Sequence, residues 1–174
     1  VMARPLTQED GKGYFMAHDG WSRTHGLTHS RQITLSPDGR MVRGQDALAA
    51  STPDERRILE AVLSRRGSEG LRYSLRFHLH PDVDAEVDLG GTAVSLALKS
   101  SEVWVFRPAD ARGMVLEPSV YLERGRLKPR PCQQIVINAR VTGLDALIGW
   151  TLAKAQDTPL AIRDLAGAED PILV

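Results

Sequence analysis

The sequence predicts an all-β fold: an antiparallel β-sandwich or stacked-sheet domain with one short helical insertion around residues 53–66. Two observations predict it. Apolar and polar residues alternate along several short segments, which is typical of strands that turn one face to a core. Glycine, proline and aspartate separate these segments at short intervals, as they do in sandwiches. We expect a single domain over 1–174, because no shift in composition marks a second one.

The first clear pair of strands is a predicted hairpin. Residues 29–35 alternate so that His29 and Arg31 share one face. The Pro-Asp-Gly sequence at 37–39 is a turn signal, and residues 41–48 return as the expected partner strand.

One segment breaks this rhythm. Residues 53–66 place apolar side chains at helical spacing, and the preceding Thr52 is a good N-cap residue. Pro53 suits the first helical position, and Glu55 completes a capping box with Thr52. Gly67 is the expected end of the helix. We therefore predict a short amphipathic helix in a connection between two strands.

The strands after this helix follow the period of two again. From 71 to 80 every odd position is apolar and every even position is polar. The tail, 158–174, shows no clear period and is expected to be irregular. The further predicted strands are 85–89, 92–98, 102–107, 114–116, 120–123, 133–141 and 147–153.

Composition limits the classes of partner. The 174 residues include 22 basic and 22 acidic ones, and the isoelectric point is near 7.1. This balance predicts no long-range attraction to nucleic acid or to an anionic membrane. No apolar run approaches the roughly 20 residues that span a bilayer. The single cysteine, Cys132, cannot form an internal disulfide, and we expect it to be structural.

Two histidines form an H-x-H pair. Because side chains alternate along a strand, His78 and His80 lie on one face, roughly 7 Å apart at Cα. Such a pair can bind zinc when further ligands arrive from neighbouring strands. The interpretation that we favour is structural, with both imidazoles hydrogen-bonded on a half-buried sheet face, and a substrate or proton-transfer role ranks last. The available partners for a metal site are His18, Asp19, His25 and His29.

One tryptophan and a set of arginines suggest contact with a sugar. Trp21 follows a His-Asp-Gly turn and can stack on the apolar face of a pyranose, although burial in a core or a domain interface is the favoured interpretation. Guanidinium groups fit carboxylates and sulfates, so an acidic polysaccharide is a candidate ligand. A solvated strand face is slightly favoured over this role. The arginines are Arg23, Arg31, Arg40 and Arg43.

Common catalytic patterns do not occur in the sequence. It contains no G-x-S-x-G, no Walker A, no C-x-x-C and no H-E-x-x-H. The adjacent Gly90 and Gly91 lack the strand-to-helix context of a phosphate loop. We therefore predict no self-sufficient active site.

Several short motifs follow one another in a specific order. They are His18-Asp19-Gly20-Trp21, His29-Ser30-Arg31 leading into Ile33-Thr34-Leu35-Ser36, Gly44-Gln45-Asp46, Arg76-Phe77-His78-Leu79-His80-Pro81, and Glu117-Pro118-Ser119-Val120-Tyr121 followed by Gln134-Ile135-Val136-Ile137. The ordered set resembles heparinase II/III-like proteins over residues 14–140. Trp21 stands where that family has tyrosine, which exchanges one aromatic side chain for another.

The resemblance implies a two-part enzyme, in which an N-terminal α/α toroid precedes layered antiparallel sheets. Its reaction is β-elimination: a base removes the C5 proton of a uronic acid, and an acid protonates the leaving glycosidic oxygen. The family's catalytic Asn, His and Tyr lie in the toroid. Its H-x-D and H-N-T stretches, early in the β region, carry a metal-binding or catalytic His. The sequence contains no H-N-T, and no H-x-D occurs in its first 79 residues, so no catalytic residue is carried over.

The chain is therefore expected to be the non-catalytic C-terminal β domain of a larger polysaccharide lyase, and to be inactive alone. Its expected partners are the toroid and an acidic polysaccharide, not nucleic acid or a membrane. The resemblance implies a periplasmic or secreted location, and zinc or another divalent metal is a candidate cofactor of the full-length protein. The candidate substrate-facing residues are His18, Trp21, His29, Arg31, His78 and His80, and the last two are also the metal candidates.

Two other functions are consistent with the sequence and rank below the lyase domain. A free-standing carbohydrate-binding module requires an exposed aromatic platform, formed by Trp21 with Tyr14 or Tyr121. A metal-dependent, cupin-like enzyme requires His78 and His80 to converge with a carboxylate or a third histidine around a dry cavity.

Overall fold

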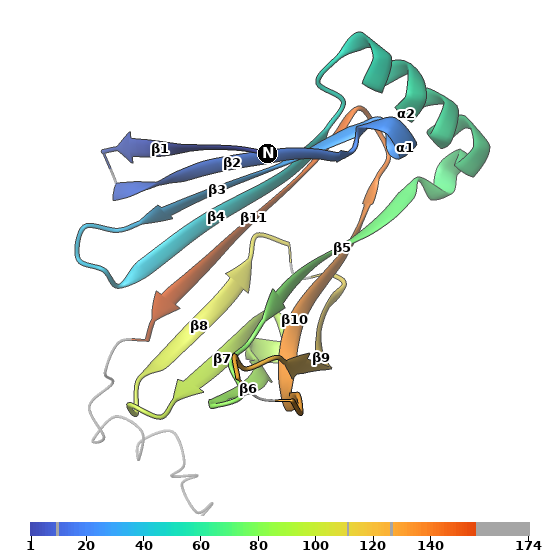
Figure 1. Ribbon diagram of the computed structural model, residues 1–174. Helices are drawn as coiled ribbons and strands as arrows, with labels where there is room; N and C mark the ends of the chain where they lie inside the picture. Colours follow the sequence, from blue (N-terminus) through green and yellow to red (C-terminus); the bar gives the residue numbers. More distant parts are fainter. Residues whose placement is uncertain (10, 111, 126, 156–174) are drawn as a thin grey trace, which may run out of the picture.

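The computed structural model describes residues 1–9, 11–110, 112–125 and 127–155. In this part of the chain, two antiparallel sheets face each other, as Figure 1 shows. The arrangement confirms the predicted stacked-sheet fold with a helical insertion. The predicted irregular tail, 158–174, lies outside the described residues.

The larger sheet has eight strands within the described residues. They are β1 (Met2–Gln8), β2 (Gly11–Trp21), β3 (Leu27–Leu35), β4 (Met41–Ala49), β6 (Val83–Asp88), β7 (Ala93–Leu98), β8 (Val103–Pro108) and β11 (Asp145–Lys154). Their order is β1-β2-β3-β4-β11-β8-β7-β6, so β11 joins the first four strands to the other three. The sequence prediction missed β1, because its residues show no alternation.

The smaller sheet has the order β5-β10-β9, with β5 (Leu71–His78), β9 (Met114–Tyr121) and β10 (Arg130–Val141). The two segments predicted at 114–116 and 120–123 form one strand, β9. Pro118 is tolerated inside it because β9 is an edge strand, and a proline there removes no hydrogen bond from a central ladder.

The helix α2 (Pro53–Arg66) confirms the predicted insertion between β4 and β5. The Thr52 hydroxyl accepts a hydrogen bond from the Glu55 backbone nitrogen at 3.2 Å, and the Glu55 carboxylate accepts one from the Thr52 backbone nitrogen at 3.0 Å. This is the predicted capping box. The same carboxylate accepts a 2.7 Å hydrogen bond from Thr28 on β3, which attaches the helix to the larger sheet. Among the described helices, none has the length and apolar character to cross a membrane.

A single helical turn between β2 and β3, α1 (Ser22–His25), was not predicted. It ends at Gly26, which has a left-handed φ of 68°. A Cβ atom at Gly26 would lie 2.1 Å from the Glu55 backbone oxygen. Glycine is therefore required where α1 packs against α2.

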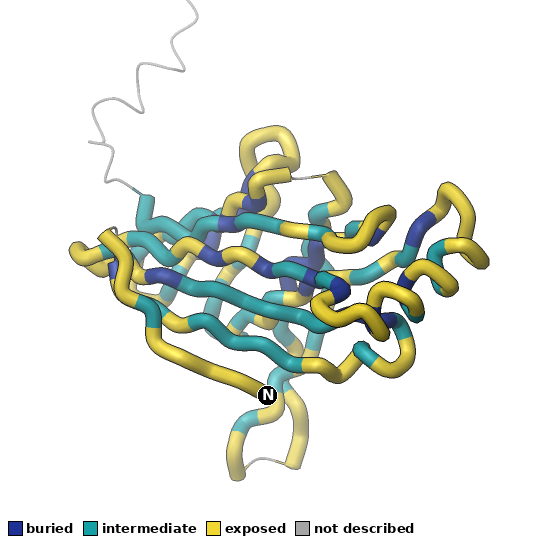
Figure 2. Tube along the Cα trace, turned by 90° about the horizontal axis from the view of Figure 1, so that it is seen from above, coloured by how far each residue is buried: buried dark blue, intermediate teal, exposed yellow. Residues whose placement is uncertain are grey.

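Two buried clusters form the core, and Figure 2 shows them as dark blue segments between exposed turns and edges. The first fills the space between the sheets and consists of Leu75, Val94, Leu96, Phe106, Ile135, Ile137 and Trp150. The second lies under α2 and consists of Leu27, Leu48, Ala50, Leu59 and Val141. Neither β1 nor β2 supplies a buried apolar side chain to these clusters.

We expect Leu59→Ala to lower the free energy of unfolding by about 2–5 kcal/mol, because it leaves a cavity at a fully buried position. Leu59 is 0% exposed and belongs to the second cluster. Urea unfolding followed by circular dichroism measures the change. The control is Glu60→Ala, on the exposed face of the same helix, with an expected change within about 0.5 kcal/mol. Equal losses in the two variants would contradict this account of the core.

Candidate functional site

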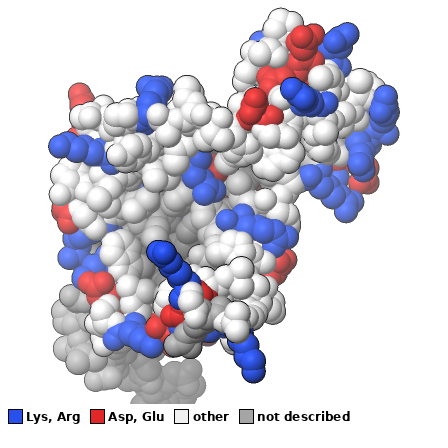
Figure 3. Space-filling model, viewed as in Figure 1, with Lys and Arg blue, Asp and Glu red and all other residues white. Residues whose placement is uncertain are grey.

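A pocket of about 440 Å³ opens between the two sheets at the end of the molecule near α1. Four of the six predicted substrate-facing residues line it: His18 and Trp21 from β2, and His29 and Arg31 from β3. The opposite wall is β5, over residues 71–76. In Figure 3, which has the view of Figure 1, the face of the molecule is hollowed near its middle, and Lys or Arg side chains lie at the border of the hollow.

Strand pairing brings the polar residues of the pocket onto one face. His18 lies opposite His29 in the pairing of β2 with β3, and Arg31 lies opposite Asp46 in the pairing of β3 with β4. Because side chains alternate along each strand, these four point to the same side of the larger sheet. The predicted common face of His29 and Arg31 is therefore part of a larger polar group.

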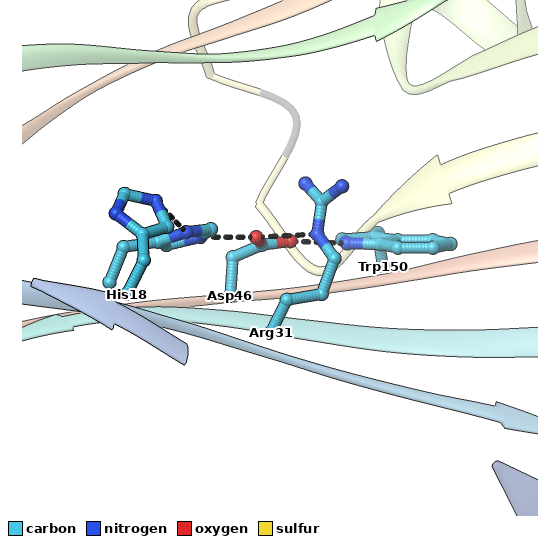
Figure 4. A network of polar contacts seen from close by, with 5 residues as sticks. His18, Arg31, Asp46 and Trp150 are labelled. Atoms are coloured by element: carbon cyan, nitrogen blue, oxygen red, sulfur yellow. Dashed lines mark hydrogen bonds and ion pairs between the residues drawn. The ribbon is translucent and has the colours of Figure 1, made fainter. Parts of the chain in front are cut away.

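The carboxylate of Asp46 is the centre of this group, as Figure 4 shows. Its Oδ1 accepts hydrogen bonds from His29 Nε2 at 2.8 Å and from Arg31 Nε at 2.7 Å. Its Oδ2 accepts one from Trp150 Nε1 at 2.9 Å. The Asp46 side chain is 2% exposed, so donors from β3 and β11 replace water around a buried charge.

The donors determine the charge of Asp46. Burial by itself would raise the pKa of this carboxyl group, because it disfavours the ionised form. The hydrogen bonds from His29, Arg31 and Trp150 outweigh burial and hold the pKa of Asp46 below its usual value of 3.8. Asp46 is therefore an anion at neutral pH.

Gly20, His18, His29 and Asp46 form a chain of hydrogen bonds, the histidine relay, in which Asp46 is the last acceptor. The Gly20 backbone N–H can only donate, and it lies 3.3 Å from His18 Nδ1. The ionised Asp46 can only accept, and its partner is His29 Nε2. His18 Nε2 lies 3.2 Å from His29 Nδ1, so His18 donates and His29 accepts when both rings are neutral. One arrangement of protons thus satisfies all three contacts with two neutral imidazoles.

Trp21 lies beside this relay at the mouth of the pocket. Its ring centroid is 4.8 Å from that of His18 and 6.1 Å from that of His29. Trp21 is 45% exposed, so the favoured prediction of a core side chain is wrong, and burial against another domain stays a prediction. Trp150, in contrast, is buried.

Arg31 is fixed on three sides. Its Nε is bound to Asp46, and its guanidinium carbon lies 5.2 Å from the centre of the Phe77 ring on β5 and 6.0 Å from that of Trp150. The slightly favoured interpretation of the arginines as a solvated strand face is therefore wrong for Arg31, which bridges the two sheets.

The other two predicted residues lie elsewhere. Odd positions of β5 face the larger sheet, so His78 points to the opposite face, where its Nδ1 lies 3.0 Å from the Ser119 hydroxyl. His80 packs against the Tyr121 ring at 5.0 Å and accepts a hydrogen bond from the Asp82 backbone nitrogen. The described residues include no group of three or more His, Cys, Asp or Glu that could hold a metal ion, so they do not supply a complete zinc site around this pair. Zinc binding by His78 and His80 stays a prediction.

The sequence reasoning did not identify Asp46 and Trp150 as site residues. The register of the predicted hairpin contains the signal for Asp46, because a turn centred between Ser36 and Met41 places residue 46 opposite residue 31. No local signal exists for Trp150, which is 104 positions from Asp46.

We expect Asp46→Asn to lower the free energy of unfolding by about 1–3 kcal/mol, because an amide cannot accept from donors on both sides as a carboxylate does. The pH dependence should change as well. The folded-state pKa of Asp46 lies below its unfolded value, so its contribution is present above pH ~4 and is lost as the pH falls through the folded pKa. The variant should lose this part of the acid sensitivity.

The control for this prediction is Asp145→Asn, which removes the same charge from an exposed position on β11. Urea unfolding of all three proteins at several pH values between neutral and acidic separates the two effects. Identical pH profiles of the Asp46 variant and the unaltered chain would show that Asp46 does not contribute as inferred.

Comparison with known proteins identifies relatives in two groups. FtsZ-localized protein C of Caulobacter vibrioides is 33% identical over 146 residues, which are 81% of this chain and 23% of that protein. The structure resembles the heparan sulfate lyase HepC from Pedobacter heparinus with a TM-score of 0.61 and 11% identity, covering 87% of this chain and 21% of that one. It resembles heparinase III with a TM-score of 0.56 and 13% identity, again covering 87% of this chain and 21% of that one.

The likeness to the two lyases shows a common fold. The chain spans 21–23% of the length of these three relatives. The family model described as Heparinase II/III-like, C-terminal, matches residues 2–158. This match covers most of the chain and confirms the resemblance that the ordered motifs indicated: the chain belongs to the Heparinase II/III-like, C-terminal family.

Proposed function

We propose that the chain is the non-catalytic β domain of a longer polysaccharide lyase, in which it supports an N-terminal α/α toroid and forms one wall of a cleft for an acidic polysaccharide. The observation that carries the proposal is the convergence of His18, Trp21, His29 and Arg31 on one pocket between the sheets. An aromatic platform beside a guanidinium group suits a pyranose that bears an anionic group.

The extent of the matches supports a partner domain. The lyases that share the fold are more than four times as long as the matched region, since the chain covers 21% of each. Their names are heparan sulfate lyase and heparinase III. Carried over to this chain, the names make a glycosaminoglycan the expected ligand of the full-length protein and β-elimination its reaction.

The arrangement of the relay supports a binding role over a catalytic one. Both ring nitrogens of His18 and of His29 are occupied by hydrogen bonds within the described residues. A general base must have a nitrogen within reach of the substrate proton. In the relay, each nitrogen instead fixes the orientation of a neighbouring ring or of Asp46.

The free-standing carbohydrate-binding module remains an alternative, because Trp21 and Tyr14 are both exposed, although the two rings line different pockets. The cupin-like enzyme has less support, since His78 and His80 have separate partners away from the pocket. A toroid distinguishes the lyase domain from the free-standing module.

We expect the 174-residue chain to bind heparan sulfate without cleaving it, because the proposed catalytic groups belong to the toroid. Cleavage by β-elimination creates an unsaturated uronate, which is followed by its ultraviolet absorbance. A longer protein that includes the toroid should produce this absorbance from a uronic-acid polysaccharide. Product formation by the 174-residue chain would overturn the non-catalytic role, and absence of binding by either protein would overturn the sugar cleft.

A second candidate function follows from the relative with the higher identity. FtsZ-localized protein C is 33% identical to this chain, compared with 11% and 13% for the two lyases. We infer as an alternative that the full-length protein acts at the site of bacterial division, in association with FtsZ, and that the β domain supports this role.

For this alternative we expect a fluorescent fusion of the full-length protein to colocalise with FtsZ at midcell and to disperse when FtsZ is depleted. The matched control is the same fusion with Leu59→Ala, which disturbs the folding of the β domain while leaving its surface residues in place. Uniform distribution of the unaltered fusion in dividing cells would refute the association.

A further inference from the structure

We propose that the pocket between the sheets is a carboxylate-binding site, in which the guanidinium group of Arg31 binds the anion and Asp46 positions Arg31. This inference rests on the proposed function, and it goes further by naming the chemical group of the ligand and the residue that selects it. Four observations support it: the fixed position of Arg31, its free terminal nitrogens, the pairing of the neighbouring arginines and the exposed indole at the pocket mouth.

The position of Arg31 is set by groups on both sheets. Asp46 binds its Nε at 2.7 Å, while Phe77 and Trp150 lie against the guanidinium group. These contacts restrict rotation about the long side chain before any ligand arrives. Binding then requires little further ordering of the side chain, which favours affinity.

The two terminal nitrogens of Arg31 face the pocket. Neither Nη1 nor Nη2 has a hydrogen-bond partner in the part of the chain that the structure describes. Figure 4 shows this end of the guanidinium group directed away from Asp46. The Arg31 side chain is 30% exposed, although the carboxylate that holds it is 2% exposed. The charged end is therefore accessible while its anchor is buried.

A carboxylate is the ligand group that this geometry fits. The two parallel N–H bonds of the guanidinium end match the two oxygens of a planar carboxylate. A sulfate ester carries the same charge, but its oxygens are much less basic and accept weaker hydrogen bonds. A neutral hydroxyl offers neither the charge nor the second acceptor. Selection for carboxylate over sulfate follows from these differences.

The neighbouring arginines of β5 are at even positions, which point away from the larger sheet, and both are already paired. Arg72 lies 3.2 Å from the Glu69 carboxylate, and Arg76 lies 2.9 Å from that of Glu117. The half-exposed Trp21 offers an apolar face at the mouth. A pocket of about 440 Å³ falls within the range of small-ligand sites, roughly 300–1,000 Å³. A carboxylated pyranose combines the group that Arg31 binds with a ring that Trp21 can cover.

The test is a titration of the 174-residue chain with four sugars by isothermal calorimetry. Glucuronate and N-acetylmuramate carry a carboxylate, glucose 6-sulfate carries a sulfate ester, and glucose is neutral. We expect at least one carboxylated sugar to bind about tenfold or more tightly than the sulfated and neutral ones. A preference between the two carboxylates identifies the source, a uronic-acid polysaccharide or a glycan of the bacterial wall. Equal affinity for sulfate and carboxylate overturns the proposal, and so does failure of both carboxylates to bind.

Two matched variants locate the site. Arg31→Lys keeps the positive charge but loses the paired N–H bonds, and it should weaken binding of the carboxylated sugar by about tenfold or more. Arg76→Lys makes the same exchange on β5, where the guanidinium group points away from the pocket and is paired with Glu117, and it should change the affinity less than twofold. Equal weakening by the two variants would indicate general attraction by charge and overturn the role of Arg31.

A measurement on the unaltered chain does not depend on the folding of a variant. The arginine Nε–H signals in a nitrogen-15 NMR spectrum should respond to the carboxylated sugar, with a larger shift for Arg31 than for Arg72 or Arg76. A saturating titration that leaves the Arg31 signal unchanged overturns the proposal. If Arg31 responds but neither this chain nor the longer protein binds polysaccharide, the carboxylate site stands and the proposed function fails.

Discussion

The buried carboxylate of Asp46 is the interaction on which the pocket depends. Its three donors come from β3 and β11, the strands on either side of its own strand β4. A buried charge that loses a partner costs several kcal/mol, so the contacts are retained or lost together. The backbone is adapted to them: a Cβ atom at Gly44 would lie 2.0 Å from the Trp150 ring, so glycine is needed for the indole to reach Asp46.

The polar group and the apolar core share residues, so the site cannot be separated from the fold. Phe77 packs against Phe106 at 4.9 Å and against Trp150 at 5.0 Å, and the same ring lies over the Arg31 guanidinium group. The charge of Arg31 is thus paired with Asp46 on the larger sheet, while the flat face of its guanidinium group packs on Phe77 of the smaller sheet. The spacing between the sheets and the direction of the guanidinium group are therefore set by the same side chains.

Local patterns in the sequence account for much of this structure. Alternation predicted most strands, the capping box predicted the start of α2, and the Pro-Asp-Gly turn predicted the hairpin that carries His29 and Arg31. The order of the strands in the sheets could not be predicted from the sequence, because the alternation within a strand is the same whichever neighbour it pairs with. For this reason the contact between Trp150 and Asp46 could not be predicted. For the same reason the sequence could not show that His78 lies away from the pocket. The even positions of β5 face away from it.

The central place of β11 has a consequence for how the chain folds. This strand inserts between β4 and β8, and its partners in β4 are about one hundred positions earlier in the sequence. Contacts over such separations form slowly, because the entropy cost of closing a long loop comes before the hydrogen bonds that compensate for it. During synthesis the β3–β4 hairpin leaves the ribosome well before its second neighbour, with one unpaired edge and the anionic Asp46 lacking its indole donor. The nascent chain is therefore exposed to mispairing until β11 emerges, and a chaperone that covers the β4 edge would act during this interval.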